Sequence, residues 1–288
     1  MNLVFFPFHD YKLSLKEGFR TRDAHIYSKA IDNKLVENII IINRPTLLLE
    51  VALRRKSMKT TGEIVYSSNR LTIQKVKDNL FVIDILDFSI IKPIKKGKGF
   101  ISELYYRNRE LIKKSLDTLN CCDFTSYESS PLTRETVNFL QPSKKVFDGV
   151  DNFCKHDSYS LIKEELKAEY HKIIESYEKI YFNGKDSLDF FNCSDNERVQ
   201  FMANGVDYER FQNKYSLPEQ YKSSKSNQRK VAVYAGKMQS MFDTKLVAYL
   251  ARKNPEVDFF FLGKILEGQP DKDLQEYRNV TFTGDIHY

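Results

Sequence analysis

The chain has 288 residues, of which 41% are hydrophobic, 29% charged and 13% aromatic. This composition excludes intrinsic disorder and a collagen-like fibre, and the length favours two domains over one. The 45 basic and 39 acidic residues give a net charge of +6, a mild excess that suits an anionic small ligand or an anionic membrane surface and makes no case for nucleic acid.

The N-terminus has no basic segment followed by a small-residue cleavage site, so it does not resemble a signal peptide. The apolar runs are far shorter than the roughly 18 residues of a membrane span. The four cysteines show neither CxxC spacing nor a disulfide framework. We therefore expect a cytoplasmic protein with reduced thiols, with peripheral contact at the inner face of the cell membrane left open.

Short apolar runs alternate with amphipathic stretches through the first two hundred residues. The pattern predicts helices over 23–35, 100–119 and 161–177, and leaves a hairpin or an insertion open within 47–73. Strands are predicted at 3–6, 39–42, 80–86, 145–150, 179–182 and 199–202. Such alternation indicates βαβ units and an α/β fold with a mostly parallel sheet.

A polar segment then separates two regions of apolar periodicity. We predict an N-terminal Rossmann-like domain over 1–211, a linker over 212–229 and the first part of a second domain over 230–288. In the second region, strands are predicted at 231–234, 259–262 and 280–282, with a helix at 243–253. A doubly wound domain takes about 100–150 residues, so the second domain is expected to be incomplete.

Ligands of open α/β sheets bind beyond the carboxyl ends of the strands, so the loops that follow predicted strands are the places to search. The sequence has no GxGxxG after its first strand and no P-loop, HExxH or GxSxG. One DxD spacing, Asp271-Lys272-Asp273, lies in a polar stretch. A solvated face explains it better than a cation site, and we predict no metal.

The loop after the first strand carries Arg20, Arg22 and Asp23 at the start of a predicted helix. A helix N-terminus attracts anions, and neighbouring arginines can clamp a phosphate or a carboxylate. The alternative is that Asp23 caps the helix and both arginines are solvated. The loop is therefore a candidate phosphate or acceptor site.

Asp148 and Asp151 stand three residues apart where another predicted strand ends, and His156 follows. Either carboxylate could orient a substrate hydroxyl or act as a general base. Aspartates are also common in turns after strands for local hydrogen bonding. In the second domain, Gly236 and Lys237 follow a strand, where glycine allows close backbone approach and lysine adds a charge, although a simple turn is equally compatible.

Several stretches, in chain order, resemble segments of GT-B glycosyltransferases. FMANGVDYERF at 201–211 resembles the NGVD-x-x-x-F segment that closes their N-terminal domain. VYAGKM at 233–238 with FD at 242–243 resembles the opening of their C-terminal domain, and 254–263 and 279–288 continue that pattern. FDGVDNF at 147–153 is similar to a stretch of the bacterial, family-4-like branch that includes teichuronic-acid-type enzymes.

The resemblance implies two facing Rossmann-like domains, a nucleotide-sugar donor on the C-terminal one, an acceptor on the N-terminal one, and no cofactor or metal. It implies a hexosyltransferase acting on a lipid-linked or glycan acceptor in bacterial surface polysaccharide synthesis. The residues it places at the site are Asp148 and Asp151 (catalytic), Gly236, Lys237, Asn204 and Gly205 (donor), and Arg20, Arg22 and Asp23 (acceptor or phosphate loop).

This sequence departs from the family in three ways: it lacks paired glycines in the first loop, a second basic residue after Gly236, and the glutamate-rich segment that grips the donor. Residues 1–288 alone are thus expected to be weak or inactive. The alternatives are a shortened, non-catalytic GT-B-like scaffold and an unrelated Rossmann-type binder. A further coding segment downstream of residue 288 would favour the enzyme.

Overall fold

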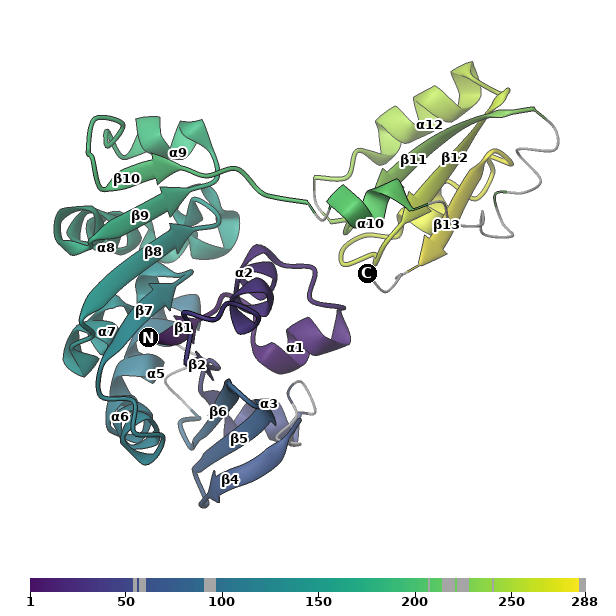
Figure 1. Cartoon of the computed structure of the whole chain (residues 1–288). Coiled ribbons are helices and arrows are strands. Elements are labelled where there is room, and N and C mark those ends of the chain that lie inside the picture. Colours follow the sequence, from purple (N-terminus) through teal and green to yellow (C-terminus); the bar gives the residue numbers. More distant parts are fainter. Residues whose placement is uncertain are drawn as a thin grey trace. The chain divides into compact units, whose positions relative to one another are not determined.

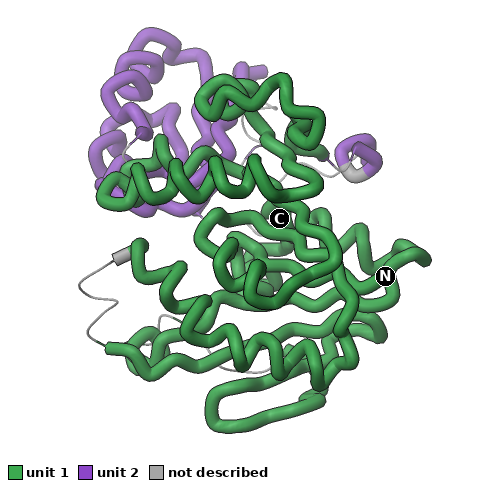
Figure 2. The backbone as a smooth tube through the Cα atoms, turned by 90° about the vertical axis from the view of Figure 1, so that its left-hand side faces the viewer, with its two compact units in different colours: residues 1–205 green, residues 206–288 purple. Residues whose placement is uncertain are grey.

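The computed structural model describes residues 1–53, 56, 61–90, 97–206, 208–213, 221, 228–239 and 241–284. The chain divides into two compact units, Met1–Gly205 and Val206–Tyr288, coloured separately in Figure 2. Each unit has its own sheet, so the expectation of two Rossmann-like α/β halves is confirmed. Most of the predicted linker, residues 214–220 and 222–227, lies outside the described residues.

Within its described residues, unit 1 is built on one ten-stranded sheet (Figure 1). The strands are β1 (Asn2–Phe6), β2 (Asn38–Ile42), β3 (Thr46–Leu47), β4 (Glu63–Ser67), β5 (Leu71–Lys77), β6 (Leu80–Asp87), β7 (Phe124–Glu128), β8 (Lys144–Gly149), β9 (Lys179–Phe182) and β10 (Val199–Phe201). The helices are α1 (Tyr11–Lys16), α2 (Arg22–Ile31), α3 (Leu48–Ala52), α5 (Phe100–Arg107), α6 (Arg109–Thr118), α7 (Arg134–Leu140), α8 (Lys163–Ser176) and α9 (Lys185–Phe190).

The strand order is β10-β9-β8-β7-β1-β2-β6-β5-β4, with β3 beside β6. Neighbouring strands from β10 to β6 are all parallel. β5 is antiparallel to β6, and β4 is antiparallel to β5. The first strand is central: β2 lies on one side of β1 and β7 on the other. The order therefore reverses between β1 and β7, which is where open α/β sheets bind ligands.

The sheet is buried on both faces because its central strands are apolar at consecutive positions. In β2, Ile39 and Ile41 pack with α2, while Ile40 and Ile42 pack with α5, α6 and α7 on the opposite face. All four isoleucines are fully buried. Burying one such side chain contributes about 1.5–3 kcal/mol to folding.

Three predictions about elements need correction. The sequence analysis missed β7, because its buried Ser126 and Glu128 interrupt the apolar run. The single helix predicted over 100–119 is two helices, α5 and α6, separated at buried Asn108. The Asn108 amide donates to Asp87 Oδ2 (2.9 Å) and Leu104 O (2.8 Å), which holds the break in place. The helix predicted over 161–177 begins as a 3₁₀ helix, Asp157–Ile162, before α8.

The open question within 47–73 is answered by the antiparallel pair β4 and β5, which extends the sheet beyond β6. Unit 2 contains α10 (Tyr208–Gln212), β11 (Lys230–Ala235), α12 (Thr244–Lys253), β12 (Val257–Leu262), α13 (Pro270–Asp273) and β13 (Val280–Gly284). Its described strands form a parallel sheet in the order β11-β12-β13. No helix in the described part of the chain has the length and hydropathy to cross a bilayer.

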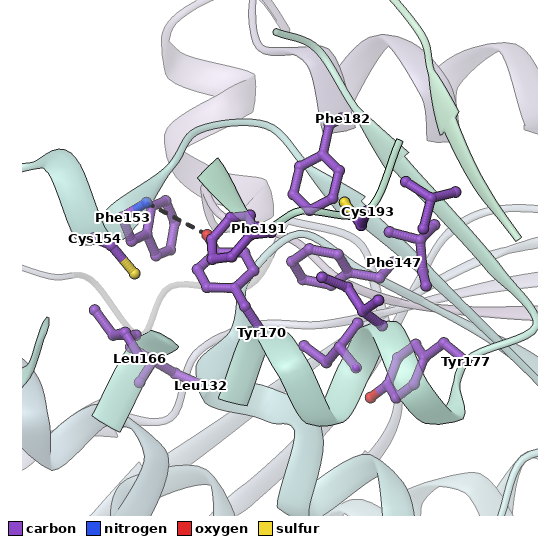
Figure 3. Close-up of a cluster of buried hydrophobic side chains, with 14 of the residues drawn as sticks. Leu132, Phe147, Phe153, Cys154, Leu166, Tyr170, Tyr177, Phe182, Phe191 and Cys193 are labelled. Atoms are coloured by element: carbon purple, nitrogen blue, oxygen red, sulfur yellow. Dashed lines mark hydrogen bonds between the residues drawn. The ribbon is translucent and has the colours of Figure 1, made fainter. Parts of the chain in front are cut away.

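A cluster of aromatic residues holds together the part of unit 1 that carries β8, β9 and α8 (Figure 3). Phe147 of β8 and Phe182 of β9 contact Tyr170 of α8 and are fully buried with it. Phe191 lies against Tyr170 and Phe182, with ring centroids 4.5 and 5.6 Å away. The loop that follows β8 packs on this cluster through Phe153 and is bonded to it through Tyr170.

Candidate functional site

The candidate site lies at the carboxyl edge of the unit 1 sheet, where β1, β7 and β8 end side by side. β1 is followed by a short loop that contains His9, then by α1 and α2, and β8 continues into the loop that contains Asp151. Ser129 N donates to Phe6 O (3.1 Å), which keeps β1 and β7 together to their last residues. The parallel pairing therefore brings together loops that are more than a hundred residues apart in the sequence.

Asp148, the penultimate residue of β8, is fully buried and bound from two elements. Arg22 Nε donates to Asp148 Oδ1 (3.0 Å) and Oδ2 (2.8 Å), and Tyr127 Oη of β7 donates to Oδ2 (2.8 Å). Burial and the negative charge of Asp148 raise the pKa of Tyr127, so its hydroxyl remains a donor. Asp148 is arranged to hold its neighbours in place, since its oxygens already accept these bonds.

The other side of Arg22 reaches the segment that leaves unit 1. Its Nη1 donates to Ala203 O (3.0 Å) and to Asn204 Oδ1 (3.1 Å). Two predicted groups, the first loop and the NGVD segment, are thus joined by one side chain. Gly205, also predicted to bind donor, is exposed and ends unit 1.

Arg20 and Asp23 serve different parts of the same loop. Arg20 donates to Glu17 Oε2 (2.9 Å from Nε), whereas Arg22 donates to Asp148, so the two guanidinium groups bind different carboxylates. Asp23 is almost fully buried, and its Oδ2 accepts from Phe8 N (2.9 Å) and His9 N (3.2 Å). Asp23 therefore fixes the loop after β1 and with it the position of His9.

Asp151 is the exposed carboxylate of the site, and a buried framework holds its backbone. Tyr170 Oη donates to Asp151 O (2.9 Å) and accepts from Phe153 N (3.4 Å), the bond drawn in Figure 3. Asn183 Nδ2 donates to Val150 O. The loop therefore presents the Asp151 side chain to solvent from a fixed main chain.

The surroundings of Asp151 shift the pKa of its carboxyl upward. Partial shielding from water raises the pKa of the Asp151 carboxyl, while the electrostatic influence of His156 and His9 acts in the opposite direction. His9 comes from the loop after β1 and His156 from the loop after β8. Sequence reasoning did not select His9, because no local motif links it to a loop 142 positions later; the parallel pairing of the strands does.

Glu128 is a second group that the sequence analysis missed, because it ends the missed strand β7. It is fully buried, and burial raises its pKa to about 7 against the opposing effect of nearby hydroxyl donors. Thr133 Oγ1 donates to Glu128 Oε2 (2.8 Å), and Ser126 Oγ donates to Oε1 (3.4 Å). A carboxyl that changes charge near neutral pH thus lies beside the β1–β7 reversal.

In unit 2, Gly236 lies directly after β11, where the main chain of a second loop approaches it. Gly236 N donates to Leu262 O (2.9 Å), and a Cβ added to Gly263 would lie 2.0 Å from Gly236 O. Lys237 is exposed, and its carbonyl accepts from Tyr234 Oη (3.2 Å). At the ends of β11 and β12, Gly236 and Gly263 therefore bring the main chains of two loops into direct contact.

The DxD stretch is part of α13, a helix of four residues. Asp271 and Asp273 are exposed on the short helix α13. Among the residues that the structure describes, no group of three or more His, Cys, Asp or Glu side chains is arranged to hold a metal ion.

No protein-family model matches the chain, and no curated protein matches it in sequence. Solved structures do resemble it. One is Anabaena HepE in complex with UDP and glucose (12% identity, TM-score 0.54), with 99% of this chain covering 70% of that one. Another is the Burkholderia xenovorans α,α-trehalose-phosphate synthase in complex with glucose-6-phosphate (9%, TM-score 0.60), with 100% covering 75%.

A third similar structure is the Neisseria meningitidis UDP-GlcNAc 2-epimerase bound to UDP-GlcNAc, at 10% identity and a TM-score of 0.52. The whole of this chain is aligned there, with 73% of the epimerase. At these identities the likeness concerns the fold. Together with the mostly parallel sheet of unit 1 and the parallel sheet of unit 2, it shows that this chain has the GT-B fold.

Proposed function

We propose that the chain belongs to a glycosyltransferase that moves a hexose from a nucleotide-diphosphate sugar to a hydroxyl of a glycan or lipid-linked acceptor. The finding that supports it most is Asp151, an exposed carboxylate on a loop anchored by Tyr170 at the carboxyl edge of the unit 1 sheet, with His9 and His156 nearby. The GT-B structures crystallised with UDP or UDP-sugars support the donor class. The resemblance of 147–153 to family-4-like enzymes favours a role in bacterial surface polysaccharide synthesis.

In this proposal the two carboxylates have different roles. Asp151 accepts the proton of the acceptor hydroxyl as the oxygen attacks the anomeric carbon, and the nucleoside diphosphate leaves. Asp148 touches no substrate and positions Arg22 and Tyr127. The main-chain amides around Gly236, with the charge of Lys237, contact the donor diphosphate.

The test incubates the protein with labelled UDP-, GDP- and dTDP-sugars and a lipid-linked or oligosaccharide acceptor. We expect transfer of the labelled hexose from one of these donors to the acceptor. Asp151→Asn should lower kcat by about 10²-fold or more. Asp157→Asn, at an exposed aspartate six residues further along, is the matched control and should retain activity.

We also expect transfer to persist in EDTA, because the proposed chemistry uses no divalent cation. Conversion of a UDP-sugar into its C2 epimer without acceptor would refute glycosyl transfer and favour an epimerase. If the folded protein neither binds UDP nor turns over any donor, the alternative, a non-catalytic GT-B-like scaffold, is favoured. Equal activity of Asp151→Asn and Asp157→Asn would remove Asp151 from the mechanism.

A further inference from the structure

The chain leaves unit 1 through a short exposed segment. The last main-chain hydrogen bond of the β9–β10 pairing runs from Met202 N to Phe182 O (2.9 Å). Residues 203–206 follow without regular structure, and all four are exposed. The division between the two compact units falls after Gly205. What holds residues 203–205 therefore determines where the connection to unit 2 begins.

Arg22 supplies that attachment. Within the described part of the chain, the hydrogen bonds that hold residues 203–205 come from Arg22 Nη1, to Ala203 O (3.0 Å) and Asn204 Oδ1 (3.1 Å). The guanidinium is a charged donor, so these bonds are stronger than bonds between neutral groups. A Cβ built on Gly205 would meet nothing within 4 Å. Arg22 thus holds Asn204, and the residue after it, Gly205, has the wide backbone freedom of a glycine.

The Arg22 side chain is itself immobilised. It is 11% exposed, and its Nε donates to both oxygens of Asp148, which is fully buried. Tyr127 binds the same carboxylate from β7. A planar guanidinium fixed at one edge by a carboxylate has its remaining N–H groups fixed in direction. The central strands of the sheet therefore determine where Nη1 points.

We propose that Arg22 anchors the connector between the two units, so that the joint begins at Gly205, with Asp148 and Tyr127 as its positioning residues. This gives a role to the buried ion pair that direct contact with substrate does not require. The catalytic consequence rests on the proposed function: a joint that starts earlier in the chain would raise KM for the donor more than it lowers kcat.

The test measures hydrogen exchange, site by site or in short peptides, over residues 200–206 of the whole chain without substrate. Arg22→Lys keeps a positive charge beside Asp148 but cannot bridge to the connector as the guanidinium does. Asn204→Ala removes one acceptor at an exposed position. We expect both to speed exchange around the Met202 amide by about fivefold. Asn138→Ala, at an exposed asparagine of α7, is the matched control.

Faster exchange confined to residues 200–206 in Arg22→Lys and Asn204→Ala supports the anchor. Wild-type exchange there in both variants overturns it, as does the same acceleration in Asn138→Ala. If Arg22→Lys fails to fold, Asn204→Ala decides alone, because its side chain is outside the buried pair. Because no substrate is present, the outcome is independent of whether the protein transfers a sugar.

Discussion

Replacing Asp148 with alanine tests the central claim about the site, that this carboxylate holds structure together. The substitution removes the acceptor of two bonds from Arg22 Nε and one from Tyr127 Oη. Asp148 is fully buried and the Arg22 side chain is 11% exposed, so water cannot replace the lost oxygens without rearrangement. A positive charge and a hydroxyl would remain in the interior without their partner.

The expected loss follows from that geometry. Removing one partner of a buried ion pair costs about 3–5 kcal/mol of unfolding free energy. In a domain of the size of unit 1, each kcal/mol lowers Tm by about 2–4 °C, so we expect a fall of about 6–20 °C. Calorimetry or circular dichroism melting of the purified chain measures it. Asp157→Asn, at an exposed site, should stay within about 0.5 kcal/mol of wild type.

A double-mutant cycle gives the sharper test. Once Arg22 is replaced by methionine, the buried charge is gone, and Asp148→Ala should then cost much less than it does in the wild-type chain. An unchanged Tm for Asp148→Ala would refute the reasoning. So would a cost that is the same in both backgrounds, because that would mean that the two side chains do not interact.

Other predictions follow from the same region. The stability that protonated Glu128 contributes is complete below its ordinary pKa of 4.5 and is lost as pH rises through about 7. Glu128→Gln cannot ionise, so urea titrations should show a smaller loss of unfolding free energy for this variant than for wild type across that interval, and equal losses would contradict the argument. Tyr170→Phe should lower unfolding free energy by about 1–2 kcal/mol and reduce kcat, because the Asp151 loop loses its hydroxyl anchor; unchanged values of both would contradict that role. Gly149→Ala should destabilise by about 1–3 kcal/mol in thermal melts, since its Cβ would lie 2.5 Å from the Phe182 ring, and a neutral result would mean that the ring moves aside.

Much of the architecture could be predicted from local pattern. The Ile39–Ile42 run predicted a strand, which the structure buries on both faces. The helix predicted over 243–253 is α12, and Asp243 is its N-cap, accepting from Leu246 N. Strand β7 was not predicted, because buried polar residues cannot be distinguished from surface residues in a linear pattern. Their hydrogen bonds are made in three dimensions, as with Glu128 and Thr133.

The sequence by itself determined the fold class, the two α/β halves and most of the loops that carry polar groups, because short apolar runs and helix periodicity are patterns of neighbouring residues. The tertiary structure decided what those groups do. It buried Asp148 under Arg22 and Tyr127, left Asp151 exposed on an anchored loop, and brought His9 and Asn204 to the same edge of the sheet. Burial and partner choice depend on parallel pairing between strands distant in sequence, and a linear pattern carries no information about which loop ends will meet.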